Sequence, residues 1–451
     1  ERSFEAASFQ HSMIREIEIK VLPEDIEKEE QIRQKAIQKA KVKSKRIRAI
    51  KIIRRSIDAR GSQPFFRLRL ALYIDDPPVD DPEIISGFNV VNSEARALII
   101  GAGPAGYFAA LELIEQGIKP VLFDRGKDVR ARRRDLRAIQ QFGIVNPNSN
   151  YCFGEGGAGT YSDGKLYTRS HKRGSIYKAL KLLVEHGAKP DILIDAHPHI
   201  GSNKLPKIVA AIRQTILDFG GEIHFDSLVT DLLIKDGKIR GLVVNRKDEY
   251  LSDAIILATG HSARDIYQML GEKGVRLEAK PFALGVRIEH SQQLIDKIQY
   301  GQWERHPNLP ASSYKLTCQV DGRGVFSFCM CPGGLVVPAA TAPGEIVVNG
   351  MSMSRRDSPY ANSGTVVAVE TEDILEFEVH GIFAGLEFQK SVEQAMFNFG
   401  DGSQKAPAQR LTDFVAGKCS ASLPDSSYIP GLSAAPLHEL LPPGIYRRLK
   451  A

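Results

Sequence analysis

A glycine-rich turn carries the strongest chemical signal in the sequence. It reads Gly-Ala-Gly-Pro-Ala-Gly over residues 101–106, directly after an apolar run at residues 96–100. In such a turn the first glycine permits the tight bend, the second lets the backbone approach a pyrophosphate, and the third lets the following helix pack on the strand. Free N–H groups at the start of that helix favour an anion. The pattern therefore predicts a dinucleotide site that includes Gly101, Gly103, Pro104, Ala105 and Gly106.

An acidic residue stands at the position where such a site needs one. Asp124 follows a second predicted strand, at residues 120–123, and lies roughly 20 residues beyond the first glycine, the spacing of a carboxylate that accepts hydrogen bonds from ribose hydroxyls. Its neighbour Arg125 is included in the predicted site. The competing interpretation is a glycine turn beside an unrelated surface acid. It is disfavoured because strand, turn, helix and acid occur together.

Two later segments extend the predicted site. Residues 154–165 are rich in glycine and polar side chains, so they can bring backbone N–H groups close to a flat ligand. Residues 258–261 end a predicted buried strand, and ligands of open α/β sheets bind at that rim. Lys165 is either a charge near the cofactor or a solvent lysine, and His261 either touches the cofactor or caps the next helix. The predicted contacts are Gly156, Gly157, Ala158, Gly159, Thr160, Ser162, Asp163, Gly164, Lys165, Ala258, Thr259, Gly260 and His261.

Two cysteines form the other chemical candidate. Cys329 and Cys331 flank Met330 on a predicted strand, where residues two apart share a face. The favoured interpretation is two small buried side chains, because free cysteine packs like a hydrophobe. The alternatives are a redox pair, a thiol that contacts the cofactor or substrate, and half a metal site. No partner ligands occur at metal-binding spacing, so no metal site is predicted. No catalytic triad or carboxylate pair stands out, and the catalytic residues stay unassigned.

The elements that must position these residues fall into three units and a tail. Residues 13–82 form a small basic α+β unit in the order β-α-β-β, which a segment rich in Asp and Pro ends. Residues 95–280 open with a strand–helix–strand unit and form a Rossmann-type domain around a doubly wound sheet. Residues 281–415 consist mainly of antiparallel strands that form a substrate or cap domain, and residues 416–451 are irregular. The predicted fold class is α/β.

Composition and charge limit the kinds of partner and the cellular location that we expect for this protein. Apolar residues make up 43% of the chain and charged residues 25%, as in soluble globular proteins, and no apolar run is long enough to cross a bilayer. With no signal peptide and only five irregularly spaced cysteines, we expect a cytoplasmic protein. Between Arg33 and Arg69, fourteen basic residues face one acid, Asp58. This window makes nucleic acid a possible partner. A solvated basic surface is the favoured interpretation, because hardly any aromatic residues stand among these basic residues.

These segments together resemble the glutathione-reductase-like FAD flavoproteins with the two-dinucleotide-binding fold. They resemble more closely a bacterial family described as uncharacterised FAD-dependent, or NAD(FAD)-utilising, dehydrogenases. The likeness covers nearly the whole chain from Met13, and the segments that carry it include residues 54–60, 154–166, 281–290, 328–334 and 347–352.

The resemblance implies FAD as the cofactor, bound by the Rossmann-type domain. Residues 156–165 would then face the flavin, the backbone of Val229 would hold the adenine end, and residues 258–260 would pass near the pyrophosphate. Such flavoproteins usually carry a further glycine-rich segment whose acid binds the ribityl chain. We find no such segment after Gly350, so the resemblance leaves that part of the site unaccounted for.

Three possible functions follow from these observations. The first is an FAD-dependent oxidoreductase, a dehydrogenase or reductase, that acts on a small molecule. NAD(P)H could serve it as a transient electron donor, without a domain of its own, because no second GxGxxG occurs between Gly201 and Gly350. The alternative is a flavoprotein that binds or modifies RNA, for which the basic window is the motive. A flavin-binding protein without turnover is the third possibility.

Overall fold

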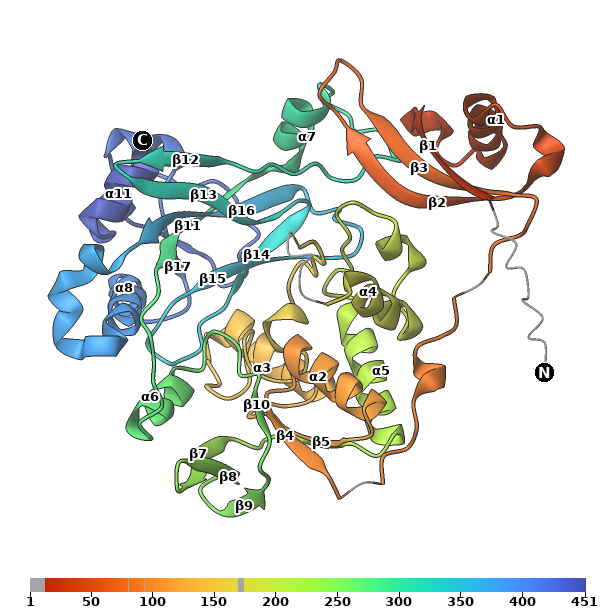
Figure 1. The fold of residues 1–451 in the computed structure, drawn as a ribbon. Helices are drawn as coiled ribbons and strands as arrows, with labels where there is room; N and C mark the ends of the chain where they lie inside the picture. The colour runs from red at the N-terminus through yellow and green to blue at the C-terminus, as the bar shows by residue number, and fades with distance from the viewer. Residues whose placement is uncertain (1–12, 80, 93, 169–173) are drawn as a thin grey trace.

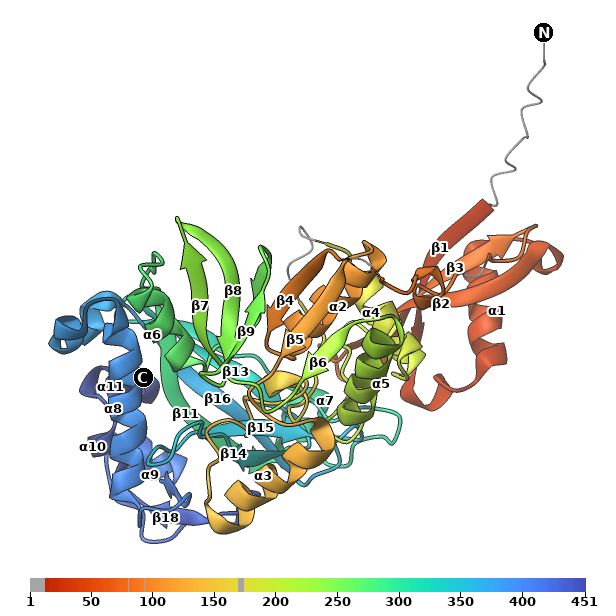
Figure 2. The same ribbon diagram turned by 90° about the horizontal axis from the view of Figure 1, so that it is seen from below.

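The structure is a computed structural model that describes residues 13–79, 81–92, 94–168 and 174–451. The N-terminal unit lies at one end of the molecule (Figures 1 and 2). Its antiparallel sheet has the order β1-β3-β2, from β1 (Met13–Val21), β2 (Ile47–Asp58) and β3 (Phe65–Ile74). These strands confirm the prediction. The helix α1 (Glu29–Ala40) begins later than predicted, because Pro23 opens a separate 3-10 turn.

Successive side chains of a strand point to opposite faces of the sheet, which explains why one face of this sheet is buried. Leu68, Leu70 and Leu72 of β3 are fully buried, and Ile32 and Ala36 of α1 pack in the same core. Arg67 and Arg69 of β3 lie on the opposite face and pair with Glu18 and Glu16. In the adjoining turns, Arg60 pairs with Asp58 and Arg46 with Asp75. Ion pairs therefore compensate part of the positive charge of the basic window.

The parallel sheet has the order β10-β4-β5-β6, formed by β4 (Arg96–Ile100), β5 (Lys119–Phe123), β6 (Glu222–His224) and β10 (Ile255–Leu257). Ile99 and Leu122 pack under helices α2 (Pro104–Glu115) and α5 (Leu205–Asp218). The predicted Rossmann-type fold is confirmed. The prediction of a buried strand at its last member is wrong: β10 pairs only with β4, and Leu257 is 44% exposed.

A small antiparallel sheet covers the other side of the parallel one. It contains β7 (Val229–Lys235), β8 (Lys238–Val244) and β9 (Asp248–Leu251), and its core joins that of helix α6 (Arg264–Glu272). The turn between β7 and β8 has positive φ at both Asp236 and Gly237, as the Asp-Gly pair predicts.

The third unit is the predicted antiparallel one. Its large sheet has the order β11-β16-β13-β12, from β11 (Phe282–Ser291), β12 (Thr317–Val320), β13 (Arg323–Cys331) and β16 (Tyr360–Val369). The ribbon β14 (Gly334–Pro338) and β15 (Val348–Ser352) lies beside it, towards helix α3 (Val129–Phe142) (Figures 1 and 2). Helix α8 (Ala384–Phe399) belongs to the same unit.

The C-terminal segment is more regular than predicted. It contains β18 (Leu432–Ala434), α10 (Leu437–Leu440) and α11 (Pro443–Lys450). Helix α11 forms because it has tertiary partners: Ile445 is buried in the same core as Phe388, and the ring of Tyr446 meets that of Phe414 edge to face at 5.1 Å. No helix of the described part of the chain is long and apolar enough to cross a membrane.

Candidate functional site

The predicted glycine turn joins β4 to α2 in a tightly packed corner. A Cβ on Gly101, whose φ is +107°, would lie 2.4 Å from the carbonyl oxygen of Ala258, the residue after β10. A Cβ on Gly106 would lie 2.0 Å from the carbonyl oxygen of Gly101. The packing of the backbone therefore requires glycine at both positions. The corner brings the ends of β4 and β10 and the start of α2 together, the rim where open α/β sheets bind ligands.

The second glycine-rich segment docks directly on this turn. The backbone N–H of Gly156 donates to the carbonyl oxygen of Ala102 at 2.8 Å. A Cβ on Gly157 would lie 3.3 Å from the Cα of Gly103, and one on Gly159 would lie 3.5 Å from the ring of Pro104. The two glycine segments, about 50 residues apart in the chain, thus form one continuous surface with few side chains.

One glycine of the turn has no packing role that the structure reveals. A Cβ on Gly103 would meet only backbone atoms of Gly157, at 3.8 and 4.0 Å, which is ordinary van der Waals contact. Pro104 and Ala105 are exposed, and within the described chain no side chain caps the N-terminus of α2. This leaves an open cradle with free backbone N–H groups, which fits a pyrophosphate.

Asp124 lies at the end of β5 beside that cradle, and only 6% of it is exposed. Its carboxylate oxygens each accept one backbone hydrogen bond, from Ala102 and from Gly126, both at 2.8 Å. Burial raises the pKa of Asp124, against these hydrogen bonds. The backbone of Gly154 also contributes a hydrogen bond to this carboxylate. A carboxylate has about four lone-pair sites, so an acceptor position stays free for a ligand's hydroxyl group.

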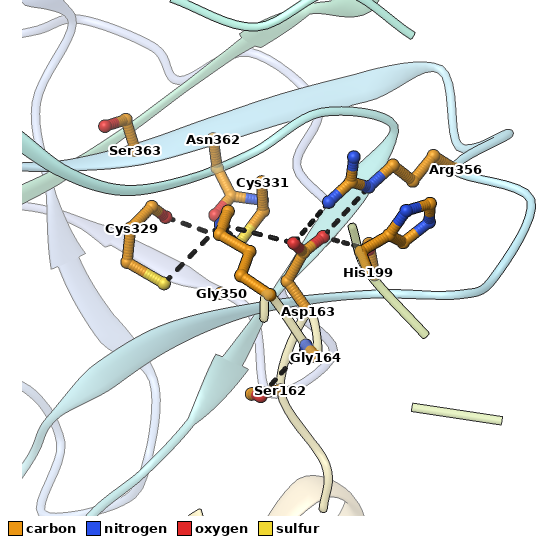
Figure 3. A network of polar contacts seen from close by, with 12 residues as sticks. Ser162, Asp163, Gly164, His199, Cys329, Cys331, Gly350, Arg356, Asn362 and Ser363 are labelled. Carbon is orange, nitrogen blue, oxygen red and sulfur yellow. Dashed lines mark hydrogen bonds and ion pairs between the residues drawn. The ribbon is translucent and has the colours of Figure 1, made fainter. Parts of the chain in front are cut away.

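At its far end the glycine segment is fixed by a buried ion pair. Asp163 is 1% exposed, and it accepts hydrogen bonds from the guanidinium of Arg356 at 2.5 and 3.2 Å (Figure 3). The hydroxyl of Ser352, at the end of β15, also donates to it. Burial alone would raise the pKa of Asp163, but the charges of Arg356 and Lys165 lower it overall. The pair therefore ties the glycine segment to the antiparallel unit.

The next charged residue points at the cysteine pair. The Nζ atom of Lys165 lies 3.3 Å from a carboxylate oxygen of Asp163, 3.9 Å from the Sγ of Cys329 and 3.8 Å from the Sγ of Cys331. Cys331 is fully buried, as predicted, whereas Cys329 is only partly buried. The favoured interpretation of two small buried side chains is thus wrong for Cys329, because it sits in an irregularity of β13 with a φ of +48°.

Polar residues of the antiparallel unit complete this cluster. Arg287, from β11, donates to the amide oxygen of Asn362 at 2.6 Å and to that of Asn349 at 3.1 Å. A Cβ on Gly350 would lie within 2.3–2.9 Å of Asn362, Arg287 and Cys331. Only glycine therefore fits where β15 passes these three side chains. Among the described residues, the Nε of Arg287 and the Nδ2 of Asn362 are buried without a hydrogen-bond partner. Such donors are rare and call for an acceptor.

Comparisons with known proteins agree with this arrangement. Residues 94–139 match the family model of an FAD binding domain, residues 281–451 that of the C-terminal domain of FAD-dependent proteins, and residues 13–73 a domain of unknown function. An uncharacterized protein of Clostridium beijerinckii is 40% identical over 438 residues, which cover 93% of this chain and 81% of the relative. The chain belongs to this family of FAD-dependent proteins.

Solved structures resemble this FAD-dependent protein only distantly. The tetracycline destructase Tet(51) is 13% identical with a TM-score of 0.29, and the match covers 68% of this chain and 64% of that one. A GidA-related protein from Thermus thermophilus is 13% identical with a TM-score of 0.26, over 43% of this chain and 74% of that one. Likenesses at this level say nothing about the activity of the FAD-dependent protein.

Several residues predicted to contact the cofactor of the FAD-dependent protein are engaged with the protein itself. The guanidinium of Arg125 binds Asn148 and Asp265 and lies 4.5 Å from the centre of the Phe153 ring. The hydroxyl of Thr160 donates to the carbonyl oxygen of Glu155 at 3.2 Å, and that of Ser162 donates to Gly159 at 2.7 Å. These three side chains hold their own loops in shape, which leaves the backbone of those loops as the surface.

The remaining predicted residues lie around the rim. Val229 is 4% exposed at the start of β7, and its side chain belongs to the core below the sheet. Thr259, Gly260 and His261 follow β10, and His261 is exposed. The alternative that His261 caps the next helix is wrong, because α6 begins at Arg264 with Ala263 as its N-cap.

Sequence reasoning missed Arg287, Asn349, Asn362 and Arg356 as site residues of the FAD-dependent protein. A signal for some of them was present: the segments at residues 281–290 and 347–352, two of those that carry the family resemblance, contain Arg287, Asn349 and Gly350. Their chemistry became readable only when the fold placed them beside Lys165 and Cys331.

Proposed function

We propose that this protein is an FAD-dependent oxidoreductase that acts on a small molecule. The observation that carries the proposal is the docking of the second glycine segment on the first, through the hydrogen bond between Gly156 and Ala102. It joins the helix end, whose free N–H groups favour an anion, to the glycine segment that leads to the charged cluster around Lys165. The resemblance to NAD(FAD)-utilising dehydrogenases supports the same function.

On this proposal the chain holds FAD by its backbone more than by its side chains. The N-terminus of α2 and Gly103 receive the pyrophosphate, and Asp124 accepts from the ribose hydroxyls. Residues 258–260 pass near the pyrophosphate, the backbone of Val229 meets the adenine end, and residues 156–165 face the flavin. Bound FAD supplies two-electron transfer, while the protein supplies position and electrostatics.

The charged cluster fits the substrate side of the site. Arg287 and Asn362 present buried donors without partners among the described residues, and Lys165 adds a positive charge. Donors of this kind orient a ligand that carries carbonyl, carboxylate or similar acceptor oxygens. We therefore expect a small polar substrate with at least one acceptor oxygen. NAD(P)H remains our proposed transient electron donor.

The test combines cofactor titration with reduction. Purified protein is titrated with FAD, and the loaded protein is mixed anaerobically with NADH or NADPH while the visible flavin band is followed. We expect saturable FAD binding and bleaching by at least one nicotinamide. Arg287→Met should leave FAD affinity within about three-fold and lower the rate of the step that involves the substrate. Arg240→Met, at a surface ion pair with Asp253, should change neither the FAD affinity nor that rate. Absence of FAD binding would overturn the proposal. FAD binding without reduction by either nicotinamide would leave another donor to be sought.

The alternative of an RNA partner is weakened by the structure's surface charges. Arg60, Arg67 and Arg69 each pair with an acid, so fewer basic residues are free to neutralise phosphates than the sequence suggests. We expect no retention of the protein on tRNA at physiological salt. Retention with a steep salt dependence would promote the RNA alternative.

A further inference from the structure

The pair Cys329 and Cys331 differs from the chain's other cysteines in its surroundings. Among the described residues, the pair shares one lysine, Lys165, at nearly equal distances of 3.9 and 3.8 Å. Asp163 and Arg287 are the other charged groups that face it, from the glycine segment and from β11. Cys318 and Cys419, by contrast, are exposed. They therefore serve as reference thiols within the same molecule.

The backbone at the pair is unusual for a strand. Cys329 has a φ of +48°, and the pairing of β13 with β16 jumps from Phe328 to Cys331. Non-glycine residues with positive φ in bulges are strained, and they occur at functional sites more often than elsewhere. Here the bulge brings the Sγ of Cys331 within 3.3 Å of the carbonyl oxygen of Cys329. It leaves Cys329 partly accessible and Cys331 buried.

We propose that Cys329 and Cys331 form a redox-active dithiol that reduces a low-molecular-weight disulfide, with Cys329 as the attacking thiolate and Cys331 as the resolving thiol. The proposal goes beyond the flavin function, because it needs only residues of this chain and a disulfide substrate. Accessibility assigns the two roles: the attacking sulfur must reach the substrate, and the resolving sulfur must reach only Cys329.

The pKa values of the two thiols differ in the way expected of a reactive pair. The hydrogen bond with Cys331 lowers the pKa of Cys329 to about 5, against burial and with the help of the charges of Lys165 and Arg287. The same hydrogen bond, burial and the negative charge of Cys329 raise the pKa of Cys331. One thiol is therefore held as the thiolate and the other as its proton donor in the resting state.

The reaction balances without a further reagent. The Sγ of Cys329 attacks one sulfur of the substrate disulfide, the substrate S–S bond breaks, and the first product leaves as a thiolate. Cys329, now in a mixed disulfide, no longer carries a charge, so Lys165 can stabilise the thiolate of Cys331. Cys331 gives its proton to the departing thiolate and attacks Cys329. The second product leaves as a thiolate and takes a proton from water as its pKa requires; the pair is oxidised by two electrons, and the substrate is reduced by two.

The experiment uses dithiodipyridine as the disulfide probe on the full chain, with peptide mapping to follow each cysteine. At about pH 6 a thiol with a pKa near 5 is almost fully thiolate, while an ordinary thiol is well under 1% so. Lower nucleophilicity offsets much of this advantage, which leaves Cys329 on the order of ten-fold faster than Cys318 or Cys419. Both thiopyridone equivalents should be released from the pair, and the protein should then weigh two hydrogens less with the two cysteines joined.

Three variants separate the proposal from a merely accessible thiol. Cys331→Ser should trap a stable mixed disulfide on Cys329, and Cys331→Ala serves if the serine variant misfolds. Lys165→Met should raise the midpoint of the pH–rate profile by about one pH unit or more. Lys235→Met, at an exposed hairpin end, should leave the profile unchanged. Equal rates for Cys329 and the reference thiols, or a mixed disulfide that persists in the unaltered protein, would overturn the proposal. Because no flavin is consumed, failure here leaves the FAD titration unaffected.

Discussion

The backbone N–H of Gly156 lies 2.8 Å from the carbonyl oxygen of Ala102, and this contact fixes the second glycine segment on the first. Gly156 reaches it with a φ of +74°, and a Cβ there would lie 1.8 Å from the hydroxyl oxygen of Thr160. Any side chain at this position would therefore push the loop off the turn. The geometry of the proposed flavin site depends on this junction.

Gly103 should matter for the cofactor and not for the fold. We expect Gly103→Ala, and more strongly Gly103→Val, to weaken FAD binding by at least about ten-fold, because the side chain enters the space proposed for the pyrophosphate. The free energy of unfolding of Gly103→Ala should fall by no more than about 1 kcal/mol, since its Cβ meets no atom closer than 3.8 Å. Titration with FAD and thermal unfolding measure the two effects.

Gly106→Ala is the matched control for that variant. Its Cβ would lie 2.0 Å from the carbonyl oxygen of Gly101, so the helix must shift away from the strand and the variant should be destabilised. Full FAD affinity in a folded Gly103→Val protein would show that the pyrophosphate binds elsewhere.

Asp124→Ala should affect both binding and stability. Loss of a charged acceptor for the ribose hydroxyls should weaken FAD binding by about 1.5–3 kcal/mol, on the order of ten- to a hundred-fold. The backbone N–H groups of Ala102, Gly126 and Gly154 would also lose their acceptor. Asp124→Asn keeps one oxygen acceptor and should fall between the two proteins. Identical dissociation constants for unaltered and alanine proteins would mean that Asp124 does not touch the ribose.

Acid should loosen the tie between the glycine segment and the antiparallel unit. The pKa of Asp163 is lowered in the folded protein, so the ionised carboxylate contributes stability above its unfolded pKa of about 4. That contribution is lost as the pH falls through the lower, folded pKa. We expect Asp163→Asn to unfold at lower temperature at pH 7 and to flatten the pH dependence below about pH 5. An unchanged pH profile of the melting temperature would contradict this account.

Arg55 should stabilise the docking of the N-terminal unit without serving the cofactor. Its guanidinium binds Asp195 at 2.7 Å and Asp191 at 3.0 Å, and its backbone pairs with the same segment. We expect Arg55→Met to lower the free energy of unfolding by about 1–3 kcal/mol and to leave FAD affinity within about three-fold. Arg48→Met, on the same strand, is the control. A larger loss of FAD affinity would make the N-terminal unit part of the cofactor site.

Local sequence signals predicted the strands well where turn residues bound them. Strand β4 begins and ends at the predicted residues and is followed by Gly101. Turn residues also stand at the ends of other strands: Pro64 before β3, Asp75 after it, and Asp236 after β7. Helix α3 was missed, since its first half reads as a charged run; yet Arg132 in that run is fully buried and donates to the carbonyl oxygen of Asn150. A buried arginine of this kind is invisible to a hydrophobic pattern.

The candidate site also has one part that the sequence predicted and another that it did not. The turn around Gly103 and the acid Asp124 were readable because both belong to one strand–helix–strand unit. The cluster around Lys165 was not, because it joins the glycine segment to strands far along the chain. The bulge at Cys329 was also hidden, since nothing in Phe-Cys-Met-Cys indicates a positive φ that is usually left to glycine or asparagine.

The ion pair between Asp163 and Arg356 spans 193 residues of sequence, which has a consequence for biosynthesis. A ribosome that adds about 5–20 residues per second exposes Asp163 roughly 10–40 s before its arginine exists. During that interval the glycine segment can dock on the first glycine turn but has no tie to the antiparallel unit, and Cys329 and Cys331 are not yet beside Lys165. A nascent chain can therefore complete its parallel sheet early, but the mature surface forms only after β16 has been made. The charged cluster around Lys165 is therefore completed only near the end of synthesis.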